Sequence, residues 1–160
     1  MTAKQQPNFG VEPDGPCYEF VGHRAPGAMP AALPTQPGQA SRDQNGRAIL
    51  LHFAPSRWLV PAPDSALVEQ LTGLAAQGLG ALVDVTGKWR PVRADGPSAA
   101  QALASTISVE AVLKDRDCAA TNLFDCPAIL ARTGQSFDLW VTASYVDHFL
   151  YVIRTLRLPS

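Results

Sequence analysis

The 160-residue sequence has little charge and no segment suited to crossing a membrane. Asp, Glu, Lys and Arg make up 17% of its residues, and the net charge is −1; an average soluble protein has roughly 25% charged residues. So small a net charge excludes a strong electrostatic attraction to nucleic acid or to an anionic membrane. No apolar run approaches the roughly 18 residues that span a bilayer, and the N-terminus lacks the apolar core of a secretion signal. We therefore expect a cytoplasmic protein that binds neither nucleic acid nor membrane.

Cysteine is also scarce, and the number of cysteines is odd. The three cysteines are Cys17, Cys118 and Cys126. In a reducing compartment we expect three free thiols, which are usually buried. Cys118 and Cys126 are eight positions apart, outside the spacing of about two to four residues that is typical of zinc knuckles. The histidines, His23, His52 and His148, lie in separate segments without ligand spacing. The sequence thus predicts no metal site.

Patterns typical of catalysis are missing as well. Gly78-Leu-Gly80 precedes an expected strand instead of opening a helix after one, so it does not fit a dinucleotide-binding loop. Cys126 stands directly before Pro127 at the start of an expected strand, which favours a structural role over a nucleophilic one. A Cys–His pair that meets only in space stays open, because such pairs need no sequence spacing. We predict no catalytic, cofactor-binding or metal-binding residue in this chain.

Asp84 and the tryptophans each allow two interpretations. Asp84 could contact a ligand or accept a hydrogen bond at a turn, but strand alternation favours a place on the solvent face. Trp58, Trp89 and Trp140 could form a binding surface, yet aromatic residues in strands belong more often to a core or an interface. We favour the structural interpretation in both cases.

What the sequence has in abundance is proline and glycine near its N-terminus. Residues 1–46 contain 7 of the 14 prolines and 6 of the 12 glycines, which resist regular structure. They also include an apolar cluster of Tyr18, Phe20 and Val21. Such an arm can be flexible, can wrap its own domain or can lie along a partner. We predict an extended arm over residues 1–46 that lies along a partner, with Tyr18 and Phe20 buried there and not against the chain's own sheet.

Residues 47–160 predict a single α+β domain. Its pattern is strand, strand, helix, three times over, with Asp64 and Ser144 as expected helix N-caps and Asp147 completing a capping box. Residues 115–125 are expected to form a loop. The fold class is thus a mostly antiparallel sheet of strand-strand-helix units with helices packed on it, preceded by the extended arm. The expected strands cover residues 48–54, 58–61, 81–85, 88–93, 128–132 and 136–142, and helices follow Asp64, Pro97, Ser108 and Ser144.

An ordered set of short motifs carries a family resemblance. The motifs are Trp58-Leu-Val-Pro, Val83-Asp-Val-Thr, Leu103-Ala, Cys118-Ala-Ala-Thr, Pro127-Ala-Ile-Leu-Ala-Arg, Phe137-Asp-Leu-Trp-Val and Ser144-Tyr-Val-Asp-His-Phe-Leu. From about residue 48 to 156, the chain resembles the gamma subunits of heterotetrameric sarcosine oxidase. That family is similar in fold to part of the folate-binding module of glycine-cleavage T-proteins. The arm matches no family motif, and the loop before Pro127 looks short, which leaves the substrate open.

The resemblance implies a non-catalytic small subunit of an oxidoreductase complex. In such complexes alpha and beta flavoprotein subunits carry FAD, FMN, NAD and tetrahydrofolate, and a small delta subunit binds zinc. The complex oxidatively demethylates an N-methyl amino acid or a related amine and passes the one-carbon unit to tetrahydrofolate. Two alternatives remain: a stand-alone folate-binding or aminomethyltransferase-like protein, and a free-standing regulatory domain. One small sheet offers little concave surface for folate, which weighs against the first.

Overall fold

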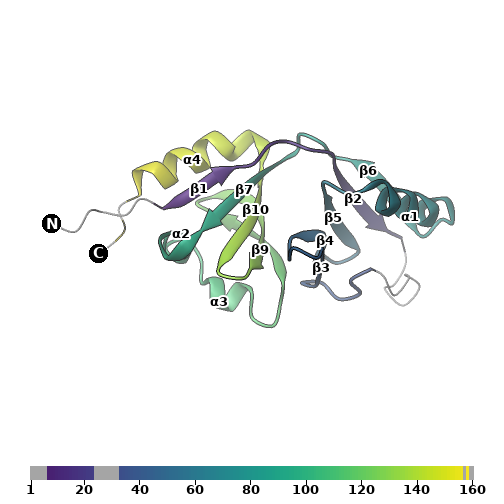
Figure 1. Ribbon diagram of the computed structural model, residues 1–160, viewed down its shortest axis with the longest axis horizontal. Coiled ribbons are helices and arrows are strands. Elements are labelled where there is room, and N and C mark those ends of the chain that lie inside the picture. Colours follow the sequence, from purple (N-terminus) through teal and green to yellow (C-terminus); the bar gives the residue numbers. More distant parts are fainter. Residues whose placement is uncertain (1–6, 24–32, 157, 159–160) are drawn as a thin grey trace.

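The computed structural model describes residues 7–23, 33–156 and 158, and has an α+β fold built on two antiparallel sheets (Figure 1). In spatial order, sheet A consists of β1 (Asn8–Val11), β7 (Trp89–Asp95), β10 (Ser136–Thr142), β9 (Cys126–Thr133) and β8 (Cys118–Leu123). Sheet B consists of β3 (Ala40–Arg42), β4 (Ala48–Ala54), β5 (Arg57–Pro61), β2 (Cys17–Gly22) and β6 (Gly80–Asp84).

Helices cover the outer side of each sheet. The helical elements are α1 (Ser65–Ala76), α2 (Gly96–Ala104), α3 (Val109–Val112), the 3-10 turn η2 (Ala143–Tyr145) and α4 (Val146–Thr155). Helices α2 and α4 pack on sheet A, whereas α1 packs against β6 of sheet B at the opposite end of the molecule (Figure 1). Within the described residues, no helix has the length and apolar character needed to cross a membrane.

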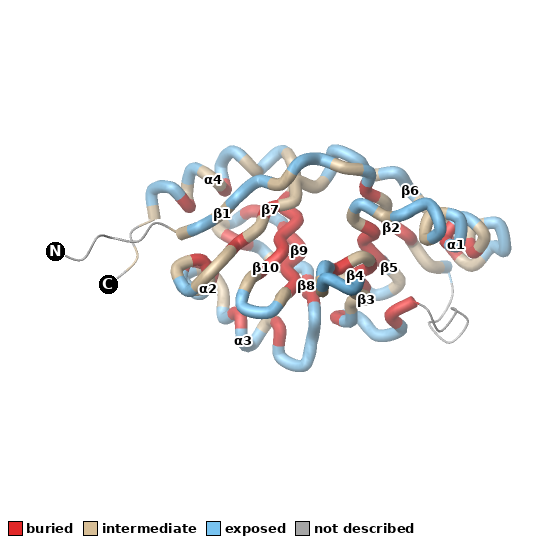
Figure 2. Tube along the Cα trace, viewed as in Figure 1, coloured by how far each residue is buried: buried red, intermediate tan, exposed pale blue. Residues whose placement is uncertain are grey.

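Strand alternation divides the buried side chains into three clusters. Figure 2 shows that buried residues lie along the strands of both sheets. The helix-side cluster, between sheet A and its helices, contains Val92, Ala94, Ala99, Ala102, Leu103, Val109, Leu113, Ala119, Leu123, Cys126, Ala128, Leu130, Phe137, Leu139, Val141, Phe149 and Ile153. The inter-sheet cluster joins the two sheets through Cys17, Ala48, Leu51, Leu59, Cys118, Ile129, Ala131 and Trp140. The outer cluster, between sheet B and α1, contains Phe20, Leu33, Leu50, Trp58, Val60, Leu71 and Leu74.

The predicted strand-strand-helix units are present as β4–β5–α1, β6–β7–α2 and β9–β10–α4. Local signals set their boundaries. The Asp64 side chain accepts a hydrogen bond of 2.8 Å from the Leu67 N–H and caps α1. Gly78, with φ of 74°, follows the end of the same helix, where a left-handed residue stops it. Pro97 occupies the first turn of α2, where its missing N–H costs nothing.

Two local predictions are wrong. Residues 115–125 are not all loop, because Cys118–Leu123 form the edge strand β8, with Phe124 and Asp125 as a left-handed turn into β9. The small and polar residues of β8 conceal the alternation that normally marks a strand. Ser144 and Asp147 form no capping box either. Ser144 lies inside the 3-10 turn η2, and α4 starts only at Val146 without a side-chain cap.

The docking predicted for the arm is also wrong. Described residues of 1–46 supply three strands, β1, β2 and β3, and β2 lies between β5 and β6 inside sheet B. Phe20 is fully buried, with its ring 5.9 Å from that of Trp58, and Tyr18 packs on the same outer cluster. The prolines and glycines near Gly15 lie in the connection between strands. Averaging composition over 46 residues therefore hid the strands themselves.

Candidate functional site between the two sheets

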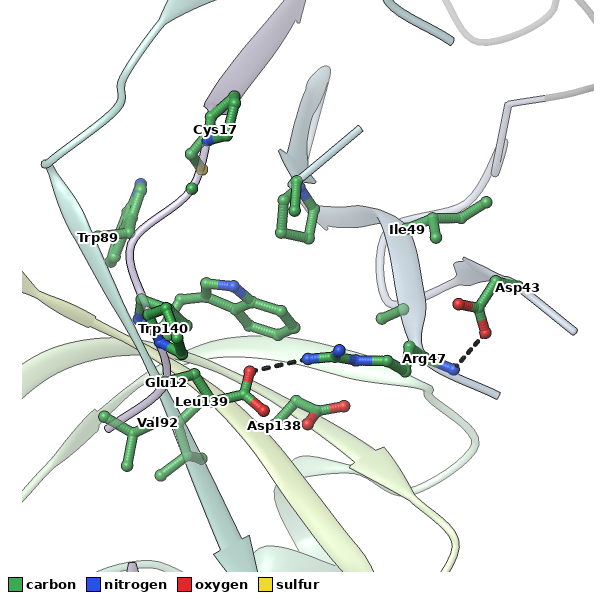
Figure 3. A pocket seen from close by; sticks show the side chains of 17 residues that line it. Glu12, Cys17, Asp43, Arg47, Ile49, Trp89, Val92, Asp138, Leu139 and Trp140 are labelled. Carbon is green, nitrogen blue, oxygen red and sulfur yellow. Dashed lines mark hydrogen bonds and ion pairs between the residues drawn. The ribbon is translucent and has the colours of Figure 1, made fainter. Parts of the chain in front are cut away.

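A cleft of about 330 Å³ opens between sheets A and B, beside the segment that connects β1 to β2 (Figure 3). Its volume is near the lower end of the roughly 300 to 1,000 Å³ that is usual for ligand pockets. The residues that line it are Glu12, Pro13, Gly15, Pro16, Cys17, Asp43, Arg47, Ala48, Ile49, Pro61, Ala62, Trp89, Pro91, Val92, Asp138, Leu139 and Trp140.

Two tryptophans and four prolines contribute to the walls of the cleft. Trp140 points from β10 toward sheet B, because its neighbours Leu139 and Val141 face the helices on the other side of sheet A. Side chains therefore alternate between the two faces of this strand, as strand geometry requires. Trp89, at the start of β7, forms a second indole wall and is half-buried. Such walls favour flat apolar groups.

The charged groups of the cleft already have partners. Arg47 pairs with Glu12 at 2.9 Å, and Asp43 accepts a hydrogen bond of 2.9 Å from the Arg47 backbone N–H (Figure 3). The Asp138 carboxylate accepts from Arg93 at 2.5 Å and from the Thr133 hydroxyl at 2.6 Å. These carboxylates therefore hold the fold around the cleft together.

Glu19 is a buried carboxylate that the sequence did not single out. It is 3% exposed, on β2, and accepts hydrogen bonds from Lys88 Nζ at 2.6 Å, from Trp89 Nε1 at 3.1 Å and from Arg57. Burial alone would raise the pKa of this carboxyl, but the bonds from Lys88, Arg57 and Trp89 outweigh it and hold the pKa below its usual value. No local pattern marks this carboxylate, because Lys88 and Trp89 are 69 and 70 positions away in the sequence.

His52 is the second buried ionisable residue of sheet B. It is fully buried, and its ring stacks on Trp58 with centroids 4.2 Å apart and planes 23° from parallel. Neither ring nitrogen has a hydrogen-bond partner among the described residues. Burial lowers the pKa of His52, and the nearby carbonyl groups of Pro34, Gln36 and Ala54 offset only part of that effect. The neutral imidazole therefore acts as a core aromatic ring.

The three cysteines are free and buried, as predicted. Burial, reinforced by nearby carboxylates, raises the pKa of Cys17 and of Cys118 to about 12. Burial also raises the pKa of Cys126. The thiolate is the nucleophile and the metal-binding form, so burial disfavours the reactive form of all three cysteines. Cys17 lines the cleft in its protonated form.

The remaining candidates occupy structural positions. Asp84 is exposed, as favoured, and it also accepts a hydrogen bond of 2.9 Å from the Thr86 N–H, which lowers its pKa, so the solvent-face and turn-acceptor interpretations both hold. Trp58 lies in the outer cluster and Trp140 in the inter-sheet cluster, which confirms the core interpretation for both. In the described part of the chain, His, Cys, Asp and Glu form no group of three that could hold a metal ion. That the chain binds no metal or cofactor stays a prediction.

Comparison with known proteins shows where the fold belongs. No family model matches the chain. Sarcosine oxidase subunit gamma of Corynebacterium sp. (strain U-96) is 30% identical over 139 residues, which cover 82% of this chain and 66% of that protein. A solved structure, heterotetrameric sarcosine oxidase from Corynebacterium sp. U-96 in complex with pyrrole 2-carboxylate, superposes with a TM-score of 0.74. That match, at 22% identity, covers 95% of this chain and 84% of the other, and shows a shared fold. The chain thus spans just under two thirds of that relative, and the resemblance to sarcosine oxidase gamma subunits that the motifs predicted is confirmed.

Proposed function

We propose that this chain is the non-catalytic, gamma-type subunit of a heteromeric, flavin-dependent complex of the sarcosine oxidase type. The complex would oxidatively demethylate an N-methyl amino acid or a related amine and pass the one-carbon unit to tetrahydrofolate. The observation that carries this proposal is the 30% identity, over 139 residues, to a sarcosine oxidase subunit gamma. The shared fold with a chain of a heterotetrameric sarcosine oxidase supports it.

The chemistry of the buried groups supports a structural role within that complex. A nucleophile or a general base needs a group that can change its protonation state near neutral pH. Here the thiols of Cys17 and Cys118 stay protonated, Glu19 stays ionised and paired, and His52 stays neutral. In the proposed complex, alpha and beta flavoprotein subunits hold FAD, FMN, NAD and tetrahydrofolate, and a delta subunit holds zinc. The complex would work in the cytoplasm.

Co-expression with candidate flavoprotein subunits from the same organism tests the proposal. A tag on this chain should recover a yellow complex that oxidises an N-methyl amine and delivers formaldehyde, or methylenetetrahydrofolate when tetrahydrofolate is present. The chain purified alone should be colourless and inactive. Flavin retained by the isolated chain, or turnover by it, contradicts the non-catalytic role. Failure to recover any flavoprotein with the tagged chain contradicts the assignment as a subunit.

The stand-alone folate-binding alternative has its own test. The cleft of about 330 Å³ would enclose only part of a ligand as large as folate. Calorimetric titration of the isolated chain with tetrahydrofolate should therefore show no saturable binding. Stoichiometric binding at micromolar affinity, lost on substitution of Trp140, would favour the alternative.

A further inference from the structure

Three arginines from three separate elements line a second groove, distinct from the cleft described above. Arg42 comes from β3, Arg116 from the turn before β8, and Arg132 from β9. Asp117 is the one acidic residue that lines this arginine groove, so the lining has a formal charge of 3 − 1 = +2. The chain as a whole has a net charge of −1. Positive charge is thus concentrated at one place on a charge-poor molecule.

Arg42 is rigidly held but its charge is not neutralised. Its Nη1 donates to the Gly46 carbonyl at 3.0 Å and to the Thr133 hydroxyl at 3.2 Å, and its Nη2 donates to the Arg132 carbonyl at 2.5 Å. All three acceptors are neutral, and no carboxylate of the described residues pairs with this guanidinium. The side chain bridges the β3–β4 turn and the end of β9, so it is fixed before any ligand arrives.

Arg116 is held in place by packing, and no other described residue pairs with its charge. Its aliphatic stem lies over Gly38, where an added Cβ would come within 2.8 Å of Arg116 Cγ. Its guanidinium, in the described structure, makes no hydrogen bond and no ion pair, and the residue is exposed. The adjacent Asp117 carboxylate instead accepts a hydrogen bond of 3.1 Å from the Ala40 N–H. The acid in the groove is therefore engaged with the backbone of sheet B.

Arg132 adds a third cation that a partner could engage. It pairs with Glu110 at 2.7 Å, but the Glu110 side chain is 84% exposed, and such surface pairs contribute little. The guanidinium also lies 5.5 Å from the centre of the Phe137 ring, which orients it. An incoming carboxylate could replace the exposed Glu110 at small cost.

We propose that the arginine groove is a docking site for an acidic segment of a partner subunit, with Asp or Glu side chains bound by Arg116 and Arg132 beside the fixed charge of Arg42. Guanidinium groups bind carboxylates through paired hydrogen bonds and are enriched at protein interfaces. The proposal rests on the function proposed above, because it needs the partner subunits. A small oxyanion such as phosphate has related chemistry and is the competing occupant.

The test compares the affinity of the chain for its separately purified partner subunits at low and high salt. Arg116→Glu should weaken assembly by roughly tenfold or more at low salt and flatten the salt dependence, as the loss of an interfacial charge pair does. Arg132→Gln should do the same to a smaller extent. Arg154→Gln removes the same charge from α4, outside the groove, and should leave affinity and salt dependence unchanged. Matching thermal unfolding of the isolated variants confirms that each is folded.

Each other outcome counts against the proposal. If Arg116→Glu and Arg132→Gln assemble like the Arg154→Gln control, the proposal is overturned while the assignment as a subunit stands. If the wild-type chain does not assemble at all, the result contradicts both the docking proposal and the assignment as a subunit. Inorganic phosphate that binds the isolated wild-type chain but not Arg116→Glu, with assembly unaffected by the substitution, would identify a small-anion site instead.

Discussion

The helix-covered face of sheet A and the body of sheet B both exclude solvent, but with different chemistry. The helix-side cluster contains apolar residues throughout, and Phe149 at its centre is fully buried against the rings of Phe9 and Phe124. Sheet B buries Glu19 and His52, two of the three buried polar residues of the described chain. The third, Asp138, lies on β10 and lines the cleft. We therefore expect the helix-side cluster to be stabilised by apolar packing, and the stability of sheet B to depend on pH as well.

The largest effect should come from the apolar region. Phe149→Ala should lower the free energy of unfolding by about 3 to 5 kcal/mol, because it removes a fully buried ring and leaves a cavity. The loss should be the same at neutral and mildly acidic pH. Chemical denaturation of the chain at several pH values measures it.

Tyr151 on the same helix is the matched control for this substitution. Its side chain is 66% exposed, so Tyr151→Ala should change stability by less than about 0.5 kcal/mol. The expectation that packing alone stabilises the helix-side cluster would be contradicted by two results. One is a loss of unfolding free energy in Phe149→Ala that depends strongly on pH, and the other is a loss no larger than that of Tyr151→Ala.

Glu19→Gln should have the next largest effect. The substitution leaves Lys88 and Arg57 without their carboxylate; both cations are 44% exposed, so water compensates part of the loss. We expect a decrease of roughly 2 to 3 kcal/mol, below the range for fully buried pairs. Because the folded pKa of Glu19 lies below its ordinary value of 4.5, its contribution is present above that pH and is lost as pH falls through the folded pKa.

The dependence of the free energy of unfolding on pH distinguishes the buried Glu19 network from surface ion pairs. Wild-type protein should lose stability below about pH 4.5 more steeply than Glu19→Gln, since the variant has no carboxylate to protonate there. Glu110→Gln removes an 84% exposed carboxylate and should retain the wild-type profile. Parallel profiles for wild type and Glu19→Gln would show that the buried network contributes nothing to acid stability.

The same contrast explains what the sequence could and could not predict. The three strand-strand-helix units depend on neighbours in the chain, such as Asp64 capping Leu67, so periodicity and capping signals sufficed. The division into two sheets depends on β2 pairing with β5 and β6, which no local pattern encodes. The site residues are equally non-local: Glu19 and Lys88 are 69 positions apart, and Arg42 bonds a carbonyl 90 positions away.

Compared with Phe149→Ala and Glu19→Gln, His52→Phe should change the free energy of unfolding least. The change should be visible only at acidic pH. His52 is fully buried and its pKa is lowered from 6.5, so the unfolded chain binds a proton that the folded chain excludes. Stability is therefore lost as pH falls below about 6.5, by up to about 2 kcal/mol at pH 5 for one such group. Phenylalanine retains the stacking on Trp58 and has no proton to bind.

Wild type and His52→Phe should consequently be of similar stability above about pH 7 and diverge toward pH 5, with the variant the more stable. The exposed His148 on α4 provides the control: His148→Gln removes a histidine that water surrounds, and should leave the pH profile unchanged. In Phe149→Ala the slope between pH 7 and pH 5 should equal that of wild type, because the ionisable group of the helix-side cluster is the Cys126 thiol, and burial raises its pKa further above this range. If His52→Phe instead keeps the wild-type slope, proton uptake at His52 does not weaken sheet B, and the proposed contrast between the two regions rests on Glu19 alone.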